Sequence, residues 1–148
     1  SILKQANAMS FSPIFFGCDG LDGILSIEGF DTKLAEGTML LTPFAADATD
    51  AATQKFVTAY KSAYDASTLN QFAADAYDAM YIIKAAAEKA NVNANMSISE
   101  ICEAMKPAMT QISVNGVTGT GMTWKATGEV NKSPKAVKIV NGAYVAMD

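Results

Sequence analysis

The chain has 148 residues, 11 basic and 15 acidic side chains, a formal net charge of −4, and apolar residues at 50% of its positions. This length suits one globular domain or part of a larger one. It contains neither His nor Arg, which argues against a Ser/His/Asp or Cys/His catalytic centre, an imidazole-bound metal and a guanidinium clamp for phosphate. We therefore expect no enzyme activity, no metal site and no cofactor.

The same composition limits the partners. The acidic balance and the scattered lysines provide no basic stripe that could neutralise a phosphate backbone, so nucleic acid is not an expected partner. The most apolar runs, 39–41 and 81–83, are far shorter than the roughly 20 residues that span a bilayer. No basic or apolar leader follows Ser1, so we expect that any targeting segment has been removed or lies outside this chain, which we interpret as a fragment.

The first 42 residues alternate between predicted helix and strand. Four elements are expected, a helix at 2–9, a strand at 14–16, one or two helical turns at 24–28 and a second strand at 37–42. The run at 14–16 is continuously apolar and ends at Gly17, which is typical of a strand buried on both faces of a parallel sheet. Pro43 cannot donate into a strand ladder and should end the second strand. This order indicates an α/β fold.

Three helices are predicted in the middle of the chain, at 51–64, at 70–90 and from 98 onward. Asp47 and Asp50 precede the first of them, where carboxylates stabilise a helix N-terminus. Asn70 is the expected N-cap of the second helix, and Asn91 should end it. The third opens on the capping box Ser97–Glu100 and should end or kink at Pro107.

Short strands joined by tight turns are predicted after Gly116. They are expected at 122–124, 127–129, 136–140 and 143–145, with Asn141-Gly142 as a strong hairpin signal. We interpret the glycine-rich run at 116–121 as a turn into this antiparallel ribbon and not as a phosphate-binding loop, because it follows no clear strand and opens no helix.

Several side chains receive structural interpretations. The aromatic residues at helical spacing are expected in the core: Tyr60, Tyr64, Phe72, Tyr77 and Tyr81. The acids of the long helix are interpreted as a solvated face and not as a metal site: Asp75, Asp78 and Glu88. Cys18 and Cys102 are interpreted as two buried thiols, and the sequence leaves open whether they pair.

The turn Gly17-Cys18-Asp19-Gly20 is the main candidate for a binding site. A carboxylate placed after a buried parallel strand lies at the carboxyl ends of the strands, where ligands of open α/β folds bind. It suits a cationic ammonium group. The alternative is structural, because Asp19 or Asp22 could cap the next short helix or close an Asx-turn. Cys18 has no His or cationic neighbour in the sequence that would activate it as a nucleophile.

Two ordered series of residues cover nearly the whole chain. The first consists of 2–6, 11–20 and 34–44, and the second of 56–64, 76–79 and 116–119 with the closing ribbon. Together they resemble the later half of the branched-chain amino-acid (Leu/Ile/Val) type of periplasmic solute-binding protein of ABC importers, which has the type I periplasmic-binding-protein fold.

In that family two α/β lobes joined by hinge strands close around a small ligand. The resemblance implies that 1–42 belongs to the second lobe, that 43–116 is a helical segment of the first lobe, and that 117–148 returns to the second. The first-lobe sheet would lie upstream, so the chain would be a C-terminal portion. Its strands should then have open edges that favour dimerisation or swapping.

The resemblance also implies a site. Asp19 stands at the acidic position of the family's G-x-[D/E]-G turn, which binds the α-ammonium of the ligand. Cys18, Gly20 and Leu21 would be its ligand-binding neighbours, and Leu21 replaces the aromatic residue that many members carry.

The function that the resemblance implies is that of an extracytoplasmic, non-catalytic receptor. It would be found in the periplasm or as a cell-surface lipoprotein, bind a branched-chain or other apolar amino acid and deliver it to a membrane permease. The alternative is a sensing or interaction domain of the same fold that binds a ligand without an amino group.

Overall fold

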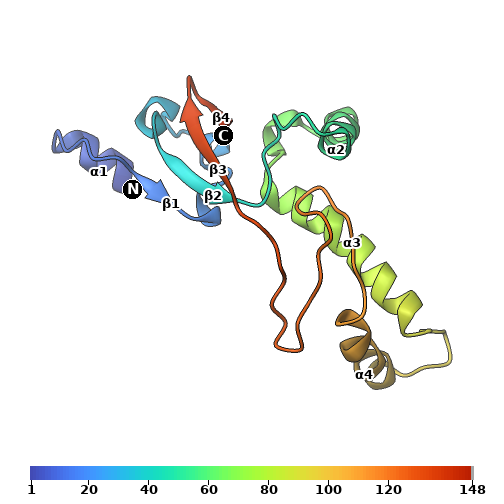
Figure 1. The fold of residues 1–148 in the computed structure, drawn as a ribbon. Coiled ribbons are helices and arrows are strands. Elements are labelled where there is room, and N and C mark those ends of the chain that lie inside the picture. Colours follow the sequence, from blue (N-terminus) through green and yellow to red (C-terminus); the bar gives the residue numbers. More distant parts are fainter. Residues whose placement is uncertain (148) are drawn as a thin grey trace. The chain divides into compact units, whose positions relative to one another are not determined.

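A computed structural model describes residues 1–147 (Figure 1). The helices are α1 (Ile2–Ala8), α2 (Ala51–Ala63), α3 (Gln71–Lys89) and α4 (Ile98–Met109), and the strands are β1 (Phe16–Gly17), β2 (Met39–Thr42), β3 (Lys135–Val140) and β4 (Ala143–Met147). Short 3-10 turns lie at Asp19–Leu21, Ile24–Ser26, Thr32–Ala35 and Ala66–Thr68. The chain divides into two compact units, Ser1–Ala73 with Pro134–Asp148, and Ala74–Ser133.

The four strands of the described residues form one sheet in the order β1-β2-β3-β4, all within the first unit. β1 pairs with β2 in parallel, and β2 pairs with β3 and β3 with β4 in antiparallel fashion. Asn141 and Gly142 join β3 to β4 with φ angles of 52° and 73°, the left-handed conformations that an Asn-Gly hairpin turn requires. The mixed α/β class and the closing hairpin are therefore confirmed.

The core of the first unit lies on one face of this sheet. Leu40 of β2 and Val137 of β3 are buried against Ala45, and Leu21 and Tyr144 pack against this group. Burial alternates along β2, as expected for a strand with one face toward a core.

The helix ends follow the capping signals of the sequence. Asp50 accepts a hydrogen bond from the backbone N of Thr53 at 2.9 Å. The predicted capping box of α4 is present, with Ser97 and Glu100 bonded to each other's backbone N. α3 is followed by Asn91 in a left-handed conformation, with φ 54°. Pro107 lies in the last turn of α4, which ends at Met109.

Several predictions of burial are wrong. Ile14 and Phe16 are 80% and 60% exposed, and the strand expected at 14–16 is observed as the two-residue β1, Phe16–Gly17, at the end of the sheet order. Four of the five aromatic residues expected in the core are exposed, Tyr64, Phe72, Tyr77 and Tyr81. Cys18 and Cys102 are free and exposed rather than buried.

The residues that α3 buries are not the aromatic residues expected in the core. The helix buries Gln71, Ala74, Asp78 and Ala86, which recur at helical spacing on one face, and it exposes the larger apolar residues. Asp78 is thus not part of a solvated face. Asp75 pairs with Lys132 at 2.6 Å, and Lys84 pairs with Glu88 on the exposed side.

The ribbon after Gly116 contains fewer strands than expected. The segments 122–124 and 127–129 form no strand, and isolated antiparallel bridges join Val114 to Met122 and Trp124 to Val130. The run at 116–121 is a turn, as predicted, in which the backbone N of Gly116 donates to the carbonyl of Gly119 at 2.8 Å. No helix in the described part of the chain has both the length and the apolar character needed to cross a membrane.

Candidate binding site

The acidic turn follows β1 directly. Cys18 has an extended backbone, and Asp19 begins a 3-10 turn that ends at Leu21. The Asp19 side chain is exposed, and its Oδ1 accepts a hydrogen bond from the backbone N of Gly20 at 3.0 Å. Its Oδ2 accepts no hydrogen bond from the described residues. The turn therefore presents a carboxylate oxygen that can accept from a bound donor.

Asp22 has a different role from Asp19. Its Oδ1 accepts from the backbone N of Gly23 at 2.9 Å, and its Oδ2 accepts from the backbone N of Gln71 at 2.7 Å. Gln71 is the first residue of α3, so Asp22 caps a helix that begins 49 residues later. The structural alternative predicted for Asp22 is correct in kind, since it caps a helix, although not the next short one.

Gln71 connects the turn to the end of β2. Its side-chain Nε2 donates to the backbone carbonyl of Asp19, and its Oε1 accepts from the Thr42 hydroxyl at 3.1 Å. Thr42 is the last residue of β2 and is buried. One buried amide side chain therefore joins the acidic turn, β2 and α3.

Leu21 is held on both sides. A Cβ atom on Gly17 would lie 2.3 Å from Leu21 Cδ1, so the absence of a side chain at Gly17 makes room for Leu21. The Leu21 carbonyl accepts a hydrogen bond from the Tyr144 hydroxyl of β4 at 3.3 Å. Leu21 also packs against the buried group around Leu40.

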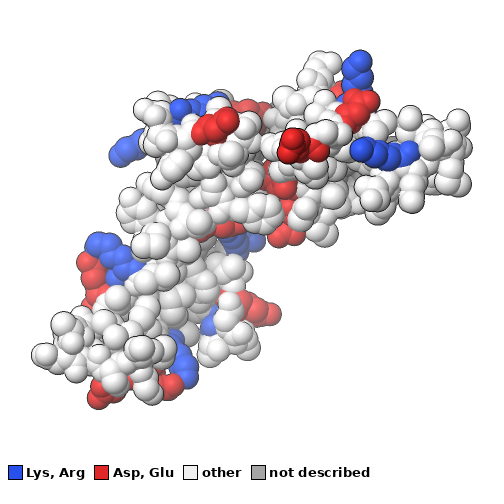
Figure 2. Space-filling model, turned by 180° about the vertical axis from the view of Figure 1, so that it is seen from behind, with Lys and Arg blue, Asp and Glu red and all other residues white. Residues whose placement is uncertain are grey.

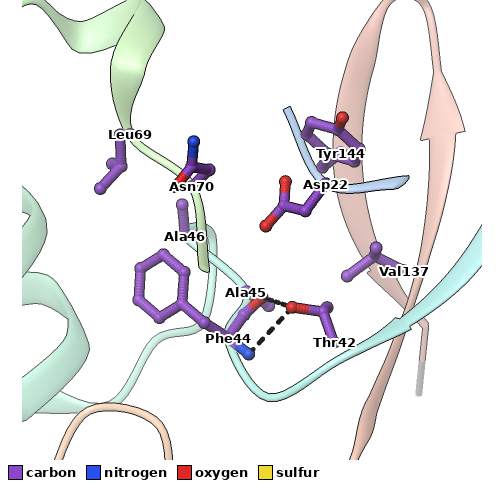
Figure 3. Close-up of a pocket in the computed structure, with 9 residues that line it drawn as sticks. All are labelled: Asp22, Thr42, Phe44, Ala45, Ala46, Leu69, Asn70, Val137 and Tyr144. Carbon is purple, nitrogen blue, oxygen red and sulfur yellow. Dashed lines mark hydrogen bonds between the residues drawn. The ribbon is translucent and has the colours of Figure 1, made fainter. Parts of the chain in front are cut away.

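Two cavities lie beside the turn, both within the first unit. The larger is an open groove of about 800 Å³ lined by Cys18, Gly20 and Leu21, by the first residues of α1 and by residues 27–30. Asp19 does not line it. The smaller holds about 30 Å³ and is lined by Asp22, Thr42 and Tyr144 among others. Figure 3 shows the Asp22 and Tyr144 side chains next to each other at this smaller cavity.

The charged side chains of the described residues form no large patch of one sign on the face shown in Figure 2. Basic and acidic side chains are interspersed over a mostly uncharged surface on the face shown in Figure 2. No group of His, Cys, Asp or Glu among the described residues could hold a metal ion. A carboxylate with a free oxygen forms short, charge-assisted hydrogen bonds with an ammonium group.

The structure brings the four predicted site residues together in one turn, and it adds two that the sequence did not indicate. Cys18, Asp19, Gly20 and Leu21 are consecutive and follow β1. Gln71 and Tyr144 hold the backbone of this turn from α3 and β4.

The chain is similar in sequence to one known protein family. The sequence profile of the periplasmic binding protein family matches residues 1–143. A search of curated protein sequences gives no significant match.

Solved structures of similar fold cover almost all of the chain. A leucine-binding protein of Thermotoga maritima is 24% identical, with a TM-score of 0.77 over 99% of this chain and 40% of that one. A branched-chain amino-acid transporter binding protein of Streptococcus pneumoniae, solved with isoleucine, is 23% identical, with a TM-score of 0.77 over 98% and 39%. An ABC-transporter solute-binding protein of R. palustris, solved with benzoate, is 17% identical, with a TM-score of 0.74 over 99% and 38%. The chain thus spans about two fifths of the length of these structures.

Proposed function

Because this chain belongs to the periplasmic binding protein family, we propose that it is part of the extracytoplasmic substrate-binding component of an ABC importer. The ligand would be an amino acid, branched-chain or otherwise apolar, and the partner a membrane permease. The family and the fold are those of solute-binding proteins, and we assign no catalytic role to any residue. The observation that carries the proposal is the exposed Asp19 carboxylate, whose Oδ2 is available at the end of a parallel strand.

The proposed contact is between Asp19 and the α-ammonium of the amino acid. An ammonium group has three donors and no acceptor, so it suits a carboxylate that no other cation occupies. No lysine lies within ion-pair distance of Asp19 among the described residues. Cys18, Gly20 and Leu21 are included in the proposed site because they adjoin Asp19 in the turn, although the groove that these three residues line does not include Asp19.

The two-lobe arrangement is part of the proposal. It assigns 1–42 and 117–148 to one lobe and 43–116 to the other, with a hinge near Thr42-Pro43. The antiparallel pairing of β2 with β3 supports the joining of the first and last segments in one lobe. The boundaries between the two compact units lie after Ala73 and after Ser133, later in the chain than the proposed lobe limits. The lobe limits therefore stay a prediction.

A thermal-shift screen of the full-length protein against the amino acids tests the function. A ligand at 100 times its Kd should add about 2.7 kcal/mol to the free energy of unfolding. We expect Asp19→Asn to weaken binding by about 10- to 100-fold, because it replaces a charge-assisted hydrogen bond with a neutral one.

Asp65→Asn is the matched control for that variant. Asp65 is also exposed, and it also accepts a local hydrogen bond, from the backbone N of Ser67 at 2.9 Å. We expect no change in ligand binding from it. If Asp19→Asn binds as the wild type does, the ammonium contact is wrong.

Binding should require both lobes. We expect the 148-residue chain alone to bind amino acids no better than about 1 mM, roughly −4 kcal/mol. Calorimetry that gave micromolar leucine binding to the isolated chain would contradict this.

A second candidate is a sensing domain of the same fold that binds a ligand without an amino group. The R. palustris solute-binding protein solved with benzoate supports only the ligand class of this candidate, since benzoate has no ammonium group. A strong thermal shift with a carboxylic acid, together with none from any amino acid, would exclude the amino-acid ligand and select the ligand class of this candidate.

The isolated chain is also proposed to dimerise or to exchange strands. The outer edge of β1 has no strand partner among the described residues, and Ile14 and Phe16 are exposed beside it. Sedimentation at high concentration tests this, and a strictly monomeric chain would count against it.

A further inference from the structure

Gln71 is a buried junction between the acidic turn and two other elements. It is only 1% exposed, although it is the first residue of a helix and its side chain is polar. Its backbone N, its Nε2 and its Oε1 each have a partner, in Asp22, Asp19 and Thr42. These partners lie 29 to 52 residues away in the sequence, so the contacts exist only in the folded chain.

The partners fix the direction of the amide group. The Asp19 carbonyl can only accept a hydrogen bond, so the NH₂ of Gln71 must face it and the oxygen must face Thr42. The Thr42 hydroxyl has one hydrogen, and the Phe44 carbonyl lies 3.0 Å away as a second acceptor. The Thr42 hydroxyl hydrogen is therefore shared between two acceptors, the Gln71 Oε1 and the Phe44 carbonyl in the segment after β2.

The orientation of the Asp19 carboxylate depends on its backbone. The side chain is exposed and, within the described residues, accepts only from the adjacent Gly20. No distant side chain or backbone group in the described part of the chain forms a hydrogen bond with this carboxylate. Gln71 holds the carbonyl of Asp19 itself, and Tyr144 holds the carbonyl of Leu21 two residues later.

We propose that Gln71 is the positioning residue of the Asp19 carboxylate and ties its direction to the end of β2 and the start of α3. This inference rests on the proposed function, in which Asp19 binds an ammonium group. Gln71 has no contact with the ligand and acts through the Asp19 backbone. Because Gln71 also begins α3, a displacement of the first turn of that helix would move the Asp19 carbonyl.

The test is a double-mutant cycle in the full-length protein, with L-leucine as the probe and calorimetry as the measurement. Gln71→Leu keeps the bulk of the side chain and removes both of its hydrogen bonds. We expect it to weaken leucine binding by about 10-fold in the wild-type background. In the Asp19→Asn background, where the charge is already lost, we expect it to have less than about a twofold effect.

The outcomes separate the two proposals. If Asp19→Asn alone leaves leucine affinity unchanged, the proposed function fails. If Asp19→Asn weakens binding but Gln71→Leu does not, or weakens it equally in both backgrounds, the positioning role is overturned, because a merely structural residue would act independently of the charge.

A second variant keeps the test decisive if Gln71→Leu does not fold. Thr42→Val removes the partner of the Gln71 oxygen and leaves Asp19 untouched. We expect a loss of about 3-fold that again disappears in the Asp19→Asn background. Thr53→Val is the control, since Thr53 is a buried threonine of the same unit that lies in α2 and lines neither of the two cavities. It should leave the affinity unchanged.

Discussion

Asp78 of α3 holds Thr118 with one carboxylate oxygen, which accepts from the backbone N at 2.8 Å and from the hydroxyl at 2.6 Å. The other oxygen accepts from the backbone N of Val117 at 2.9 Å. Asp78 is only 2% exposed, so these three hydrogen bonds compensate for the removal of its charge from water. This carboxylate fastens the turn after Gly116 to α3.

Asp78→Asn should destabilise the protein by about 3 kcal/mol. Asparagine has one accepting oxygen, and its NH₂ group would face backbone donors that then lose their partner. Urea unfolding followed by circular dichroism measures the change in the free energy of unfolding. The control is Asp75→Asn, which removes the partly exposed ion pair with Lys132 and should change stability by less than about 1 kcal/mol. Equal effects of the two variants would contradict the role given to Asp78.

Gly17→Ala should disturb Leu21 and thereby the core beneath the acidic turn. The added Cβ would lie 2.3 Å from Leu21 Cδ1 and 3.0 Å from its Cγ, so the leucine must move. We expect a loss of about 1–3 kcal/mol in a thermal unfolding experiment. Gly20→Ala is the matched variant, because no atom lies within 4 Å of a Cβ at that position. A similar loss in both variants would argue against the close packing of Gly17 on Leu21.

Local signals in the sequence were sufficient for most element boundaries. The capping box Ser97–Glu100 and the Asn141-Gly142 turn act between residues that are close in sequence, so they predict α4 and the final hairpin correctly. The acidic turn was also found locally, because a glycine-flanked carboxylate after an apolar run is a recognisable pattern.

Long-range contacts could not be predicted in the same way. Hydrophobic periodicity placed the large apolar residues of α3 on the buried face, but the helix buries Ala74, Gln71 and Asp78 instead. The polar pair is buried because partners from distant segments satisfy their hydrogen bonds. A Gln at the start of a helix does not indicate which distant residues it will contact. The hydrogen bond from Gln71 to the Asp19 carbonyl could therefore not be predicted from the sequence.

The stability of α2 should depend on pH through Asp50. The hydrogen bond from the backbone N of Thr53 lowers the pKa of the Asp50 carboxyl. A lowered folded-state pKa means that the stabilisation is present above the unfolded-state pKa, about 4, and is lost as the pH falls through the folded-state value.

Asp50→Asn isolates this effect, because asparagine retains an accepting oxygen but does not titrate. The side chain is exposed and screened, so we expect a loss of less than about 1 kcal/mol at neutral pH. We also expect the stability of the variant to decline less than that of the wild type below about pH 4, as measured by urea midpoints across that range. An unchanged acid profile would show that Asp50 does not contribute.

Tyr144 should give the opposite pH dependence. Burial raises the pKa of its hydroxyl, and the nearby Asp22 carboxylate raises it further, while the backbone N–H groups of residues 23–25 act in the other direction (Figure 3). A raised folded-state pKa means that the stabilisation is complete below the unfolded-state pKa of about 10 and is lost as the pH rises through the folded-state value. The same hydroxyl donates to the Leu21 carbonyl, so its ionisation would remove that bond as well.

Tyr144→Phe removes both the titrating group and the bond to Leu21. We expect a loss of about 1 kcal/mol at neutral pH, together with a smaller decline of stability above about pH 10, measured by urea unfolding in a series of alkaline buffers. Profiles of wild type and variant that run parallel above pH 10 would contradict the burial of this hydroxyl. Tyr144→Phe should also weaken leucine binding by the full-length protein, because Leu21 follows Asp19 by two residues. The loss should be less than about 10-fold, since the hydrogen bond from Gln71 to the Asp19 carbonyl remains in place.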